Sequence, residues 1–308
     1  MLQTTEAPDL TTRALTAPAS PAPRRRPTSK KRVTVGQIIK WVVLGLAGLV
    51  MLVPLYVMVI SAFKPESEIL SDPLAINPDT FTWDYLVQAI QSPNFNVVGA
   101  YGITLFFVLA VNVLSIAVSA PVAYVIARGR TRWYAALLLL FVSGLFVPSQ
   151  VILIPVVFVL RSIGLMGTIP GFLIFETAVT LPMTIFLFTA FVRTIPRDID
   201  EAASIDGAGR IRAFWSCIFP LMRPIVATMI VLNSVGVWND FVNPQIILGP
   251  GSGIYTVTTG VFAAVGQYTT DYNVVFPTLL LAVAPVLIFF IIMQRHIIGG
   301  LVAGSTKG

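Results

Sequence analysis

Six long apolar runs constrain what this chain can fold into more than any other feature of its sequence. They cover residues 38–60, 103–126, 135–160, 169–192, 225–248 and 274–293. A helix crosses the roughly 30 Å hydrocarbon core of a bilayer with about 20 apolar residues, and each run reaches about that length. The runs are continuously apolar rather than alternating, which favours helices over a membrane barrel. The sequence therefore predicts an all-α integral membrane protein with six transmembrane helices.

The basic residues predict which way these helices run. Of the 20 Lys and Arg residues, only Lys64 and Arg161 fall on one predicted face of the membrane, and the other 18 fall in the termini and loops of the opposite face. Loops on the cytoplasmic side carry an excess of Lys and Arg, so both termini are expected in the cytoplasm. The net charge of +6 then reflects topology, and nucleic acid is not an expected partner.

The chain is expected to divide into two parts. Residues 1–36 combine prolines with basic residues and lack the apolar surface to bury a core, which predicts a disordered basic cytoplasmic tail. Residues 37–308 would form the six-helix transmembrane domain. The first apolar run is too long and begins too late for a cleavable signal peptide, so it is predicted to remain as an uncleaved span.

Side chains that could carry catalysis are scarce. Cys217 is the single cysteine and His296 the single histidine, so an intramolecular disulfide, a cysteine metal cluster and histidine-dependent chemistry are not expected. An intramembrane enzyme would need a nucleophile with a base, or paired metal ligands at helical spacing. We therefore predict no catalytic residue, no metal site and no enzymatic activity.

A polar, charged interval separates two of the apolar runs at residues 193–224. Asp198 is followed three residues later by Glu201, which is the spacing of a capping box at the start of a helix. Gly207 would end that helix, because glycine tolerates the left-handed conformation. The interval is therefore predicted to begin with a short helix.

A second amphipathic stretch follows at residues 211–219, and Pro220 would end it. The two stretches together predict a helix-turn-helix on the cytoplasmic face. Asp206 lies between them, where the dipole of the first helix disfavours an anion. Its side chain would either cap the second helix or act on something outside the first one.

Two interpretations of this loop remain open from spacing alone. Glu201 could simply cap its helix, while Ala202, Ala203 and Gly207 allow the helix to pack. Small residues beside a sharp turn are also what a surface needs when the cleft of a partner closes around it. The loop is accordingly a candidate docking site.

The loop is similar to a known motif. It resembles the EAA loop of binding-protein-dependent ABC importer permeases through residues 201–208 and the positions that follow them, Phe214, Ile218, Pro220, Leu221, Arg223 and Pro224. Residues 238–241 with Pro244, and the C-terminal residues 294–308, resemble the maltose-type carbohydrate branch of that family. Residues 1–30 do not align with it.

The resemblance implies an ABC importer type I permease fold, with the loop seated as a coupling helix in a groove of a cytoplasmic ATPase. Its ATPase-coupling residues would be Glu201, Ala202, Ala203, Asp206 and Gly207. Among them, Glu201 would pair with a basic residue of the ATPase and the small residues would permit close packing. The end of the chain, residues 299–308, would reach into the ATPase dimer interface.

The resemblance also implies an assembly in a bacterial-type cell membrane, inner or plasma, surrounded by lipid. Its other members would be two cytoplasmic ATPase subunits, an extracytoplasmic sugar-binding protein and a second permease subunit, making a heterodimer. No Gly-x4-Gly-Lys-Ser/Thr phosphate loop occurs in the sequence, and residues 249–253 lack its lysine. This chain is therefore expected to bind no cofactor, with ATP and Mg²⁺ held by the partner ATPase.

Two ionisable side chains fall inside apolar runs, Glu176 in the fourth and Asp240 in the fifth. Such groups are costly in a bilayer and mark functional sites. Asn233, Gly236 and Asp240 share one helical face, which could form hydrogen bonds with a hydroxylated solute. The predicted translocation pathway comprises Glu176, Asn233, Gly236, Trp238, Asn239 and Asp240.

The polar residues of the spans have a second interpretation, as hydrogen-bond partners between neighbouring helices. We favour this interpretation for Asn112 and for part of the fifth run. Trp238 could equally be an anchor at the membrane interface or a ring that stacks on a sugar.

The leading functional hypothesis is a permease that imports a mono-, di- or oligosaccharide by alternating access between two conformations. A permease for a non-sugar solute, such as a polyol, glycerol phosphate or an amino acid, is the alternative. A secondary carrier driven by an ion gradient would need repeated halves and a buried ion relay, which two scattered carboxylates do not supply.

Overall fold

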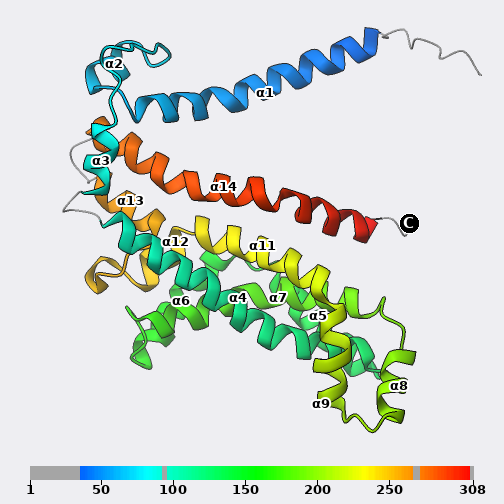
Figure 1. Ribbon diagram of the computed structural model, residues 1–308. Coiled ribbons are helices and arrows are strands. Elements are labelled where there is room, and N and C mark those ends of the chain that lie inside the picture. Colours follow the sequence, from blue (N-terminus) through cyan, green and yellow to red (C-terminus); the bar gives the residue numbers. More distant parts are fainter. Residues whose placement is uncertain (1–34, 92–95, 266–270, 306–308) are drawn as a thin grey trace, which may run out of the picture. The chain divides into compact units, whose positions relative to one another are not determined.

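The computed structural model describes residues 35–91, 96–265 and 271–305. The chain divides into two units, Met1–Met51 and Leu52–Gly308, and the described part of the first unit belongs to α1 (Val35–Ser61). Within the described ranges the elements are helices joined by loops, without a strand (Figure 1). The predicted all-α class is confirmed. The predicted tail, residues 1–36, lies almost wholly outside the described residues.

The second unit contains the remaining helices. In chain order they are α2 (Glu66–Ser71), α3 (Asp84–Ile90), α4 (Val97–Arg128), α5 (Arg132–Gly144), α6 (Ser149–Ser162), α7 (Ile169–Val192), α8 (Asp198–Ile205), α9 (Arg210–Ala213), the π-helical turn η1 (Phe214–Ile218), α10 (Phe219–Leu221), α11 (Arg223–Asn239), α12 (Val242–Ile247), the 3-10 turn η2 (Pro250–Ser252), α13 (Val257–Val265) and α14 (Tyr272–Ser305).

Four helical stretches in the described residues are long and apolar enough to cross a membrane. They are α1, α4, α7 and the Tyr272–Phe289 part of α14. The bounds of α7 are those predicted for the fourth apolar run. Two bent helix pairs also pass the test together, α5 with α6 and residues 210–221 with α11. The described part of the chain therefore has four candidate spans, or up to six if each pair is one span.

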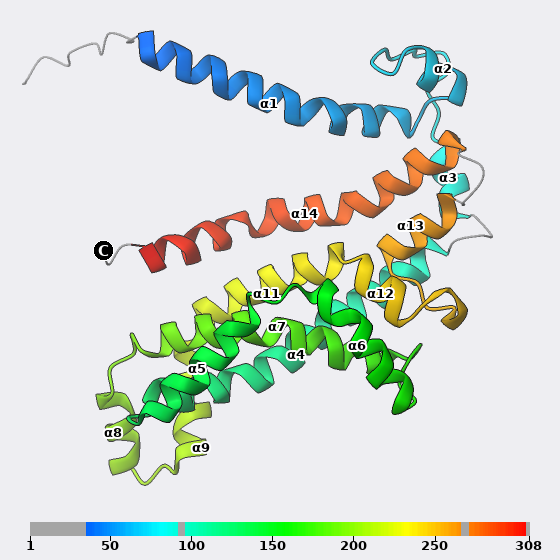
Figure 2. The same ribbon diagram turned by 180° about the vertical axis from the view of Figure 1, so that it is seen from behind.

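The third apolar run, residues 135–160, is not the continuous helix that its hydropathy predicts. Its two helices, α5 and α6, meet at 96° (Figure 2). Pro148 is the N-cap of α6, with φ −60° and ψ 131°. Proline has no N–H to continue a helix and keeps the residue before it out of the helical region. The break therefore comes from one residue that barely changes the apolar character of the run.

The fifth run, residues 225–248, is also divided, and the prediction of one helix there is wrong. α11 ends at Asn239, and Asp240 takes an extended conformation with φ −69° and ψ 125°. The Oδ1 atom of Asp240 accepts a hydrogen bond from the N–H of Asn243 at 3.3 Å, so this side chain bonds to the first turn of α12, whose N-cap is Phe241. The polar residue that marks the run as functional is also the one that interrupts its helix.

α4, α7 and α11 form the core of the second unit. In both views they lie alongside one another, with α8 and α9 at one end and α12 and α13 at the other (Figures 1 and 2). At the α12 end the ring of Phe107 packs on that of Phe172, with centroids 4.5 Å apart. Toward α8 the contact face of α4 carries small side chains that let its neighbours approach, namely Ala120, Ala123 and Ala127.

Polar side chains also join these three helices. The amide nitrogen Nδ2 of Asn112 donates a hydrogen bond to Oγ of Ser234 at 3.1 Å, which links α4 to α11. Oγ of Ser115 and Oγ1 of Thr184 lie 3.2 Å apart and link α4 to α7. The interpretation of Asn112 as a partner between spans is confirmed. Through these contacts the two ends of the unit belong to one packed body.

Lys64 is fully buried although it lies in a loop between apolar runs. Its Nζ atom donates hydrogen bonds to the carbonyl oxygens of Asp72, at 2.9 Å, and Ala75. Beside it the rings of Phe63 and Phe81 stack with centroids 4.8 Å apart. Because a buried ammonium must be hydrogen-bonded, this lysine organises the loop that contains α2.

Gly171 and Gly102 provide a matched test of helix packing. A Cβ atom on Gly171 would lie 2.1 Å from the carbonyl oxygen of Leu165, whereas one on Gly102 would meet nothing within 4 Å. We expect Gly171→Ala to lower the free energy of unfolding by about 2 kcal/mol through overpacking. Gly102→Ala should leave it unchanged or raise it by up to about 1 kcal/mol, because alanine favours helix.

Thermal unfolding of the detergent-purified chain, followed by size-exclusion chromatography, measures both variants. Only Gly171→Ala should lower Tm. Equal Tm values for the two variants would contradict the packing described for the start of α7.

Candidate functional site

α8 begins without the capping box that the sequence predicts. Its N-cap is Arg197, whose φ of −70° and ψ of −23° are already helical, and no side chain caps it. The N–H groups of Asp200 and Glu201 donate to the carbonyl of Arg197 at 2.9 and 3.1 Å, so the first turn forms one residue earlier than expected. The prediction that Asp198 pairs with Glu201 in a capping box is wrong. The acidic residues of this turn instead suit the helix dipole, which favours anions at an N-terminus.

Gly207 ends the helix as predicted. Its φ is 77°, in the left-handed region, and its N–H donates to the carbonyl of Ser204 at 3.1 Å. Asp206 is the C-cap of α8 and is exposed. The N-cap of α9 is Gly209, and no side chain caps it, so the interpretation of Asp206 as the cap of the second helix is wrong.

The second stretch continues past Pro220, where the sequence predicts its end. It runs through α9, η1 and α10 to Leu221. Pro220 has no N–H to donate one turn back, and the preceding turn widens so that the N–H of Phe219 donates to the carbonyl of Phe214. This π-helical turn buries Phe214, whose ring lies 5.1 Å from that of Tyr124 on α4.

The predicted coupling residues fall into an outer and an inner set. Glu201, Ala202, Asp206 and Gly207 are exposed, and no described side chain pairs with Glu201. Ala203 is 6% exposed and faces the interior of its own chain. A partner could therefore contact four of these five residues directly.

Large apolar side chains flank the turn between α8 and α9. Ile205 is 86% exposed and Ile211 is 78% exposed, and Trp215 follows with 45%. These three belong to the polar interval at residues 193–224. Large exposed apolar side chains near a polar turn are a feature of protein interfaces.

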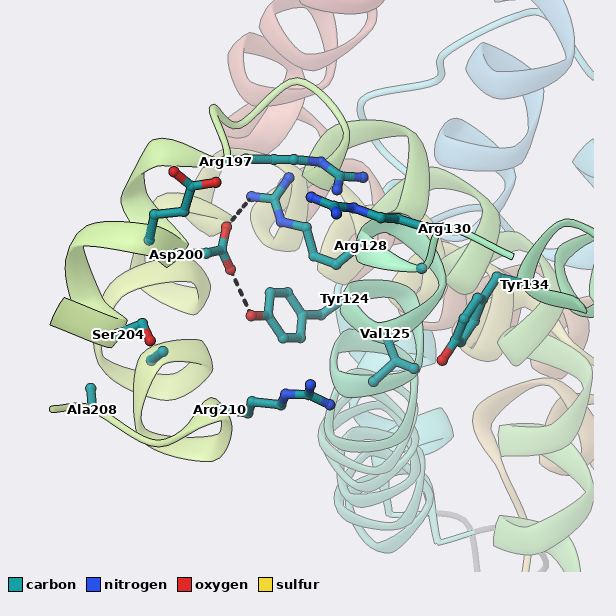
Figure 3. Close-up of a pocket in the computed structure, with 13 residues that line it drawn as sticks. Tyr124, Val125, Arg128, Arg130, Tyr134, Arg197, Asp200, Ser204, Ala208 and Arg210 are labelled. Carbon is teal, nitrogen blue, oxygen red and sulfur yellow. Dashed lines mark hydrogen bonds and ion pairs between the residues drawn. The ribbon is translucent and has the colours of Figure 1, made fainter. Parts of the chain in front are cut away.

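A cavity of about 470 Å³, here called the loop cavity, lies between α8 and the adjoining end of α4 (Figure 3). Asp200 points toward α4, and its Oδ2 atom lies 2.8 Å from Nη2 of Arg128. Its Oδ1 atom accepts a hydrogen bond from the hydroxyl of Tyr124 at 2.6 Å. Three further basic residues line the cavity, Arg130, Arg197 and Arg210. Sequence reasoning missed Asp200, although Tyr124 and Arg128 are four residues apart and share one face of α4.

A second cavity, of about 330 Å³ and here called the polar cavity, lies among α6, α7, α11 and α12. Five of the six predicted pathway residues line it: Glu176, Asn233, Gly236, Asn239 and Asp240. The structure thus brings together residues of the fourth and fifth apolar runs that sequence alone could place only at similar depths.

Trp238 is the predicted pathway residue that does not line the polar cavity. Its ring stacks on that of Tyr101 with centroids 6.3 Å apart, on a different side of α11. Its indole therefore packs between helices within this chain. The side chains of residues 299–308, predicted to reach the ATPase, lie outside the described part of the structure.

Asn243 organises the polar cavity and was missed by sequence reasoning. Its Nδ2 atom donates to Oε2 of Glu176 at 3.1 Å, and its backbone N–H donates to Asp240. Ser149, Gln150 and Thr180 also line the cavity and were missed. The proline break before Ser149 was the available signal, because irregular backbone inside a membrane occurs where it borders a cavity.

Several polar atoms at this cavity are buried without a hydrogen-bond partner among the described residues. They are Nδ2 of Asn233, Oδ2 of Asp240 and Oδ1 of Asn243. One is a donor and two are acceptors, and each costs free energy if it stays unpaired. This set can bind a small solute that both donates and accepts hydrogen bonds.

Residues 119–300 match the family described as the binding-protein-dependent transport system inner membrane component. The chain is 33% identical over 283 residues to the multiple sugar-binding transport system permease protein MsmG of Streptococcus mutans, covering 90% of this chain and 100% of that protein. It is 32% identical over 276 residues to the diacetylchitobiose uptake system permease protein NgcG of Streptomyces coelicolor, covering 87% and 88%.

Solved structures share this fold, among them a chain of a bacterial ABC transporter involved in the import of the acidic polysaccharide alginate, with a TM-score of 0.74 and 19% sequence identity. The match covers 88% of this chain and 99% of that chain. The family model, the full-length relatives and this shared fold agree, and the chain belongs to the family of inner membrane components of binding-protein-dependent transport systems.

Proposed function

We propose that this chain is a permease subunit of an ATP-driven ABC importer that moves a sugar from an external binding protein into the cytoplasm by alternating access. The observation that carries the proposal is the polar cavity, a group of unpaired donors and acceptors among helices that are otherwise apolar. The relatives named for the transport of multiple sugars and of diacetylchitobiose support a carbohydrate as the solute.

The chemistry of the polar cavity suits hydroxyl groups. Each sugar hydroxyl can donate one hydrogen bond and accept others, and Asn233, Asp240 and Asn243 offer both kinds of partner. Glu176 and Asp240 are acidic, and the described residues that line the cavity include no basic side chain that could bind an anionic solute such as glycerol phosphate. The volume of about 330 Å³ is near the lower end of the range of about 300–1,000 Å³ for ligand sites, so a second permease subunit would enlarge the site.

The topology that fits this function has six spans, with α5 and α6 crossing once as a bent pair, α11 crossing without α9 and α10, and both termini in the cytoplasm. The distribution of basic residues supports this orientation. It assigns α8 and α9 to the cytoplasm and the polar cavity to the outer half of the membrane. The cavity can then receive solute from outside while the loop meets a motor inside.

The motor would be a separate ATPase that closes around α8. Glu201, Ala202, Asp206 and Gly207 are free to contact it, with Ile205 adding apolar surface. Ala203 would serve differently, by holding α8 against this chain. ATP and Mg²⁺ would bind to the ATPase, because this chain has no phosphate loop. One such loop can serve only one of two ATPase subunits, so a second, related permease subunit would supply the other loop. The complete importer would then contain two permease subunits, two ATPases and the binding protein.

Glu201→Ala tests the loop as the coupling element. In the transporter purified with its partner subunits and reconstituted into liposomes, a sugar presented on the binding protein should stimulate ATP hydrolysis. Loss of the Glu201 carboxylate should lower that stimulation by about tenfold, in the usual range for coupling between sites. Asp198→Ala is the control, because it removes an exposed acid three residues earlier on the same helix. Normal stimulation in Glu201→Ala would exclude the loop as the coupling element.

Asn233→Ala tests the polar cavity as the solute site. Loss of one hydrogen bond to a sugar hydroxyl should raise KM for uptake by about fivefold to tenfold, because such a bond contributes about 1 kcal/mol. Asn112→Ala is the matched control, since Asn112 is a buried asparagine bonded to Ser234 between α4 and α11. It should reduce thermal stability without changing KM. Similar KM changes in both variants would argue against the cavity.

A further inference from the structure

Arg128 is the last residue of α4, and its guanidinium contacts three separate segments. Its Nη2 atom is 2.8 Å from the carboxylate of Asp200 on α8. Its Nη1 atom donates hydrogen bonds to the carbonyl oxygens of Val192 at 3.2 Å and Ile195 at 3.0 Å, where α7 ends and the chain turns toward α8. One side chain therefore joins the end of α4, the end of α7 and the first turn of α8.

Asp200 has a second partner on the same face of α4. The hydroxyl of Tyr124 donates to its Oδ1 atom at 2.6 Å, so each carboxylate oxygen has its own partner, as the dashed lines in Figure 3 show. The ring of Tyr124 is held in turn by Phe214 of η1. The carboxylate thus meets two groups whose positions are fixed by α4.

These contacts matter because few apolar side chains attach α8. Of its eight residues, Ala203 is buried and Ile199 packs partly buried against the cluster that contains Phe214. Isolated helices of this length are marginal in water, so contacts with the rest of the chain must fix the orientation of α8. Exposed ion pairs contribute little, but Arg128 and Asp200 are only 14% and 20% exposed, and separating them would leave a carboxylate facing a cavity.

We propose that Arg128, Tyr124 and Asp200 form a positioning link that makes α8 and the end of α4 move as one body when the ATPase acts on the loop. This inference rests on the proposed function of the loop. Through the link a movement of α8 would displace α4. α4 packs on both α7 and α11, and these two helices line the polar cavity, so the displacement would reach the cavity. Without the link, α8 could tilt on its turn while the spans stay in place.

Arg128→Gln and Arg130→Gln provide a matched comparison. Both remove one guanidinium from the lining of the loop cavity, but Arg130 has no hydrogen bond or ion pair with the described residues. The readout is the ratio of sugar-stimulated to basal ATP hydrolysis in the reconstituted transporter. We expect Arg128→Gln and Asp200→Asn each to lower this ratio by about tenfold, while the ATPase still co-purifies and basal hydrolysis is unchanged. Arg130→Gln should behave as the wild type.

Three outcomes would overturn the link. The ratio in Arg128→Gln could equal that in Arg130→Gln. Basal and stimulated hydrolysis could fall together at a constant ratio, which would show a structural role alone. The ratio in the double variant Arg128→Gln/Asp200→Asn could fall by the product of the two single effects, as it would for independent residues. If the two residues act as one link, the double variant should lower the ratio no more than either single variant.

Two further controls keep the test decisive. If Arg128→Gln does not assemble, Tyr124→Phe removes a single hydroxyl and should still lower the ratio by about fivefold, the loss expected for one hydrogen bond. An unchanged ratio would contradict the link. If no sugar stimulates the wild-type transporter, the proposed function fails instead. A failure of the proposed function is therefore seen in the wild-type transporter, before any variant is compared.

Discussion

The structure depends on one constraint: a backbone inside hydrocarbon must pair its own polar groups. The long helices satisfy it, and the irregular segments occur where a cavity or a side chain supplies the missing partners. Pro148 breaks the α5–α6 pair beside the polar cavity, and Asp240 ends α11 and bonds to the first turn of α12 at the same place. The residues that interrupt the helices are thus the residues that border the candidate solute site.

Between the two candidate sites stands a body of packed helices. Apolar contacts such as that of Phe107 with Phe172, and polar ones such as that of Asn112 with Ser234, hold α4 to α7 and α11. Close-packed interiors of this kind do not deform smoothly but shift between discrete arrangements. A displacement of α8 can therefore reach the polar cavity only if α8 is firmly joined to this body. Arg128 and Asp200 occupy that junction.

The sequence could predict what depends on local composition. The membrane class follows from apolar runs, Glu176 and Asp240 stand out because charge is costly in a bilayer, and Gly207 follows from the conformation a helix end requires. Asn243 and Asp200 could not be found in this way, because each is an ordinary polar residue until a partner 67 or 76 residues away is placed beside it.

The errors of sequence reasoning have a common origin. Hydropathy does not register where a helix bends, so Pro148 and Asp240 were absorbed into single spans. The capping box failed because Arg197 was already helical, and Pro220 did not end its stretch because a π-helical turn accommodates the missing N–H. In each case the backbone conformation differs from the one that residue spacing predicts.

The most direct test of the account is sugar uptake into proteoliposomes that contain the whole transporter, with the binding protein outside and ATP inside. The account predicts that a radiolabelled sugar accumulates above its external concentration, that hydrolysable ATP is required, and that dissipating ion gradients has no effect. Uptake that continues without ATP and follows an imposed ion gradient would contradict it and would favour an ion-coupled carrier.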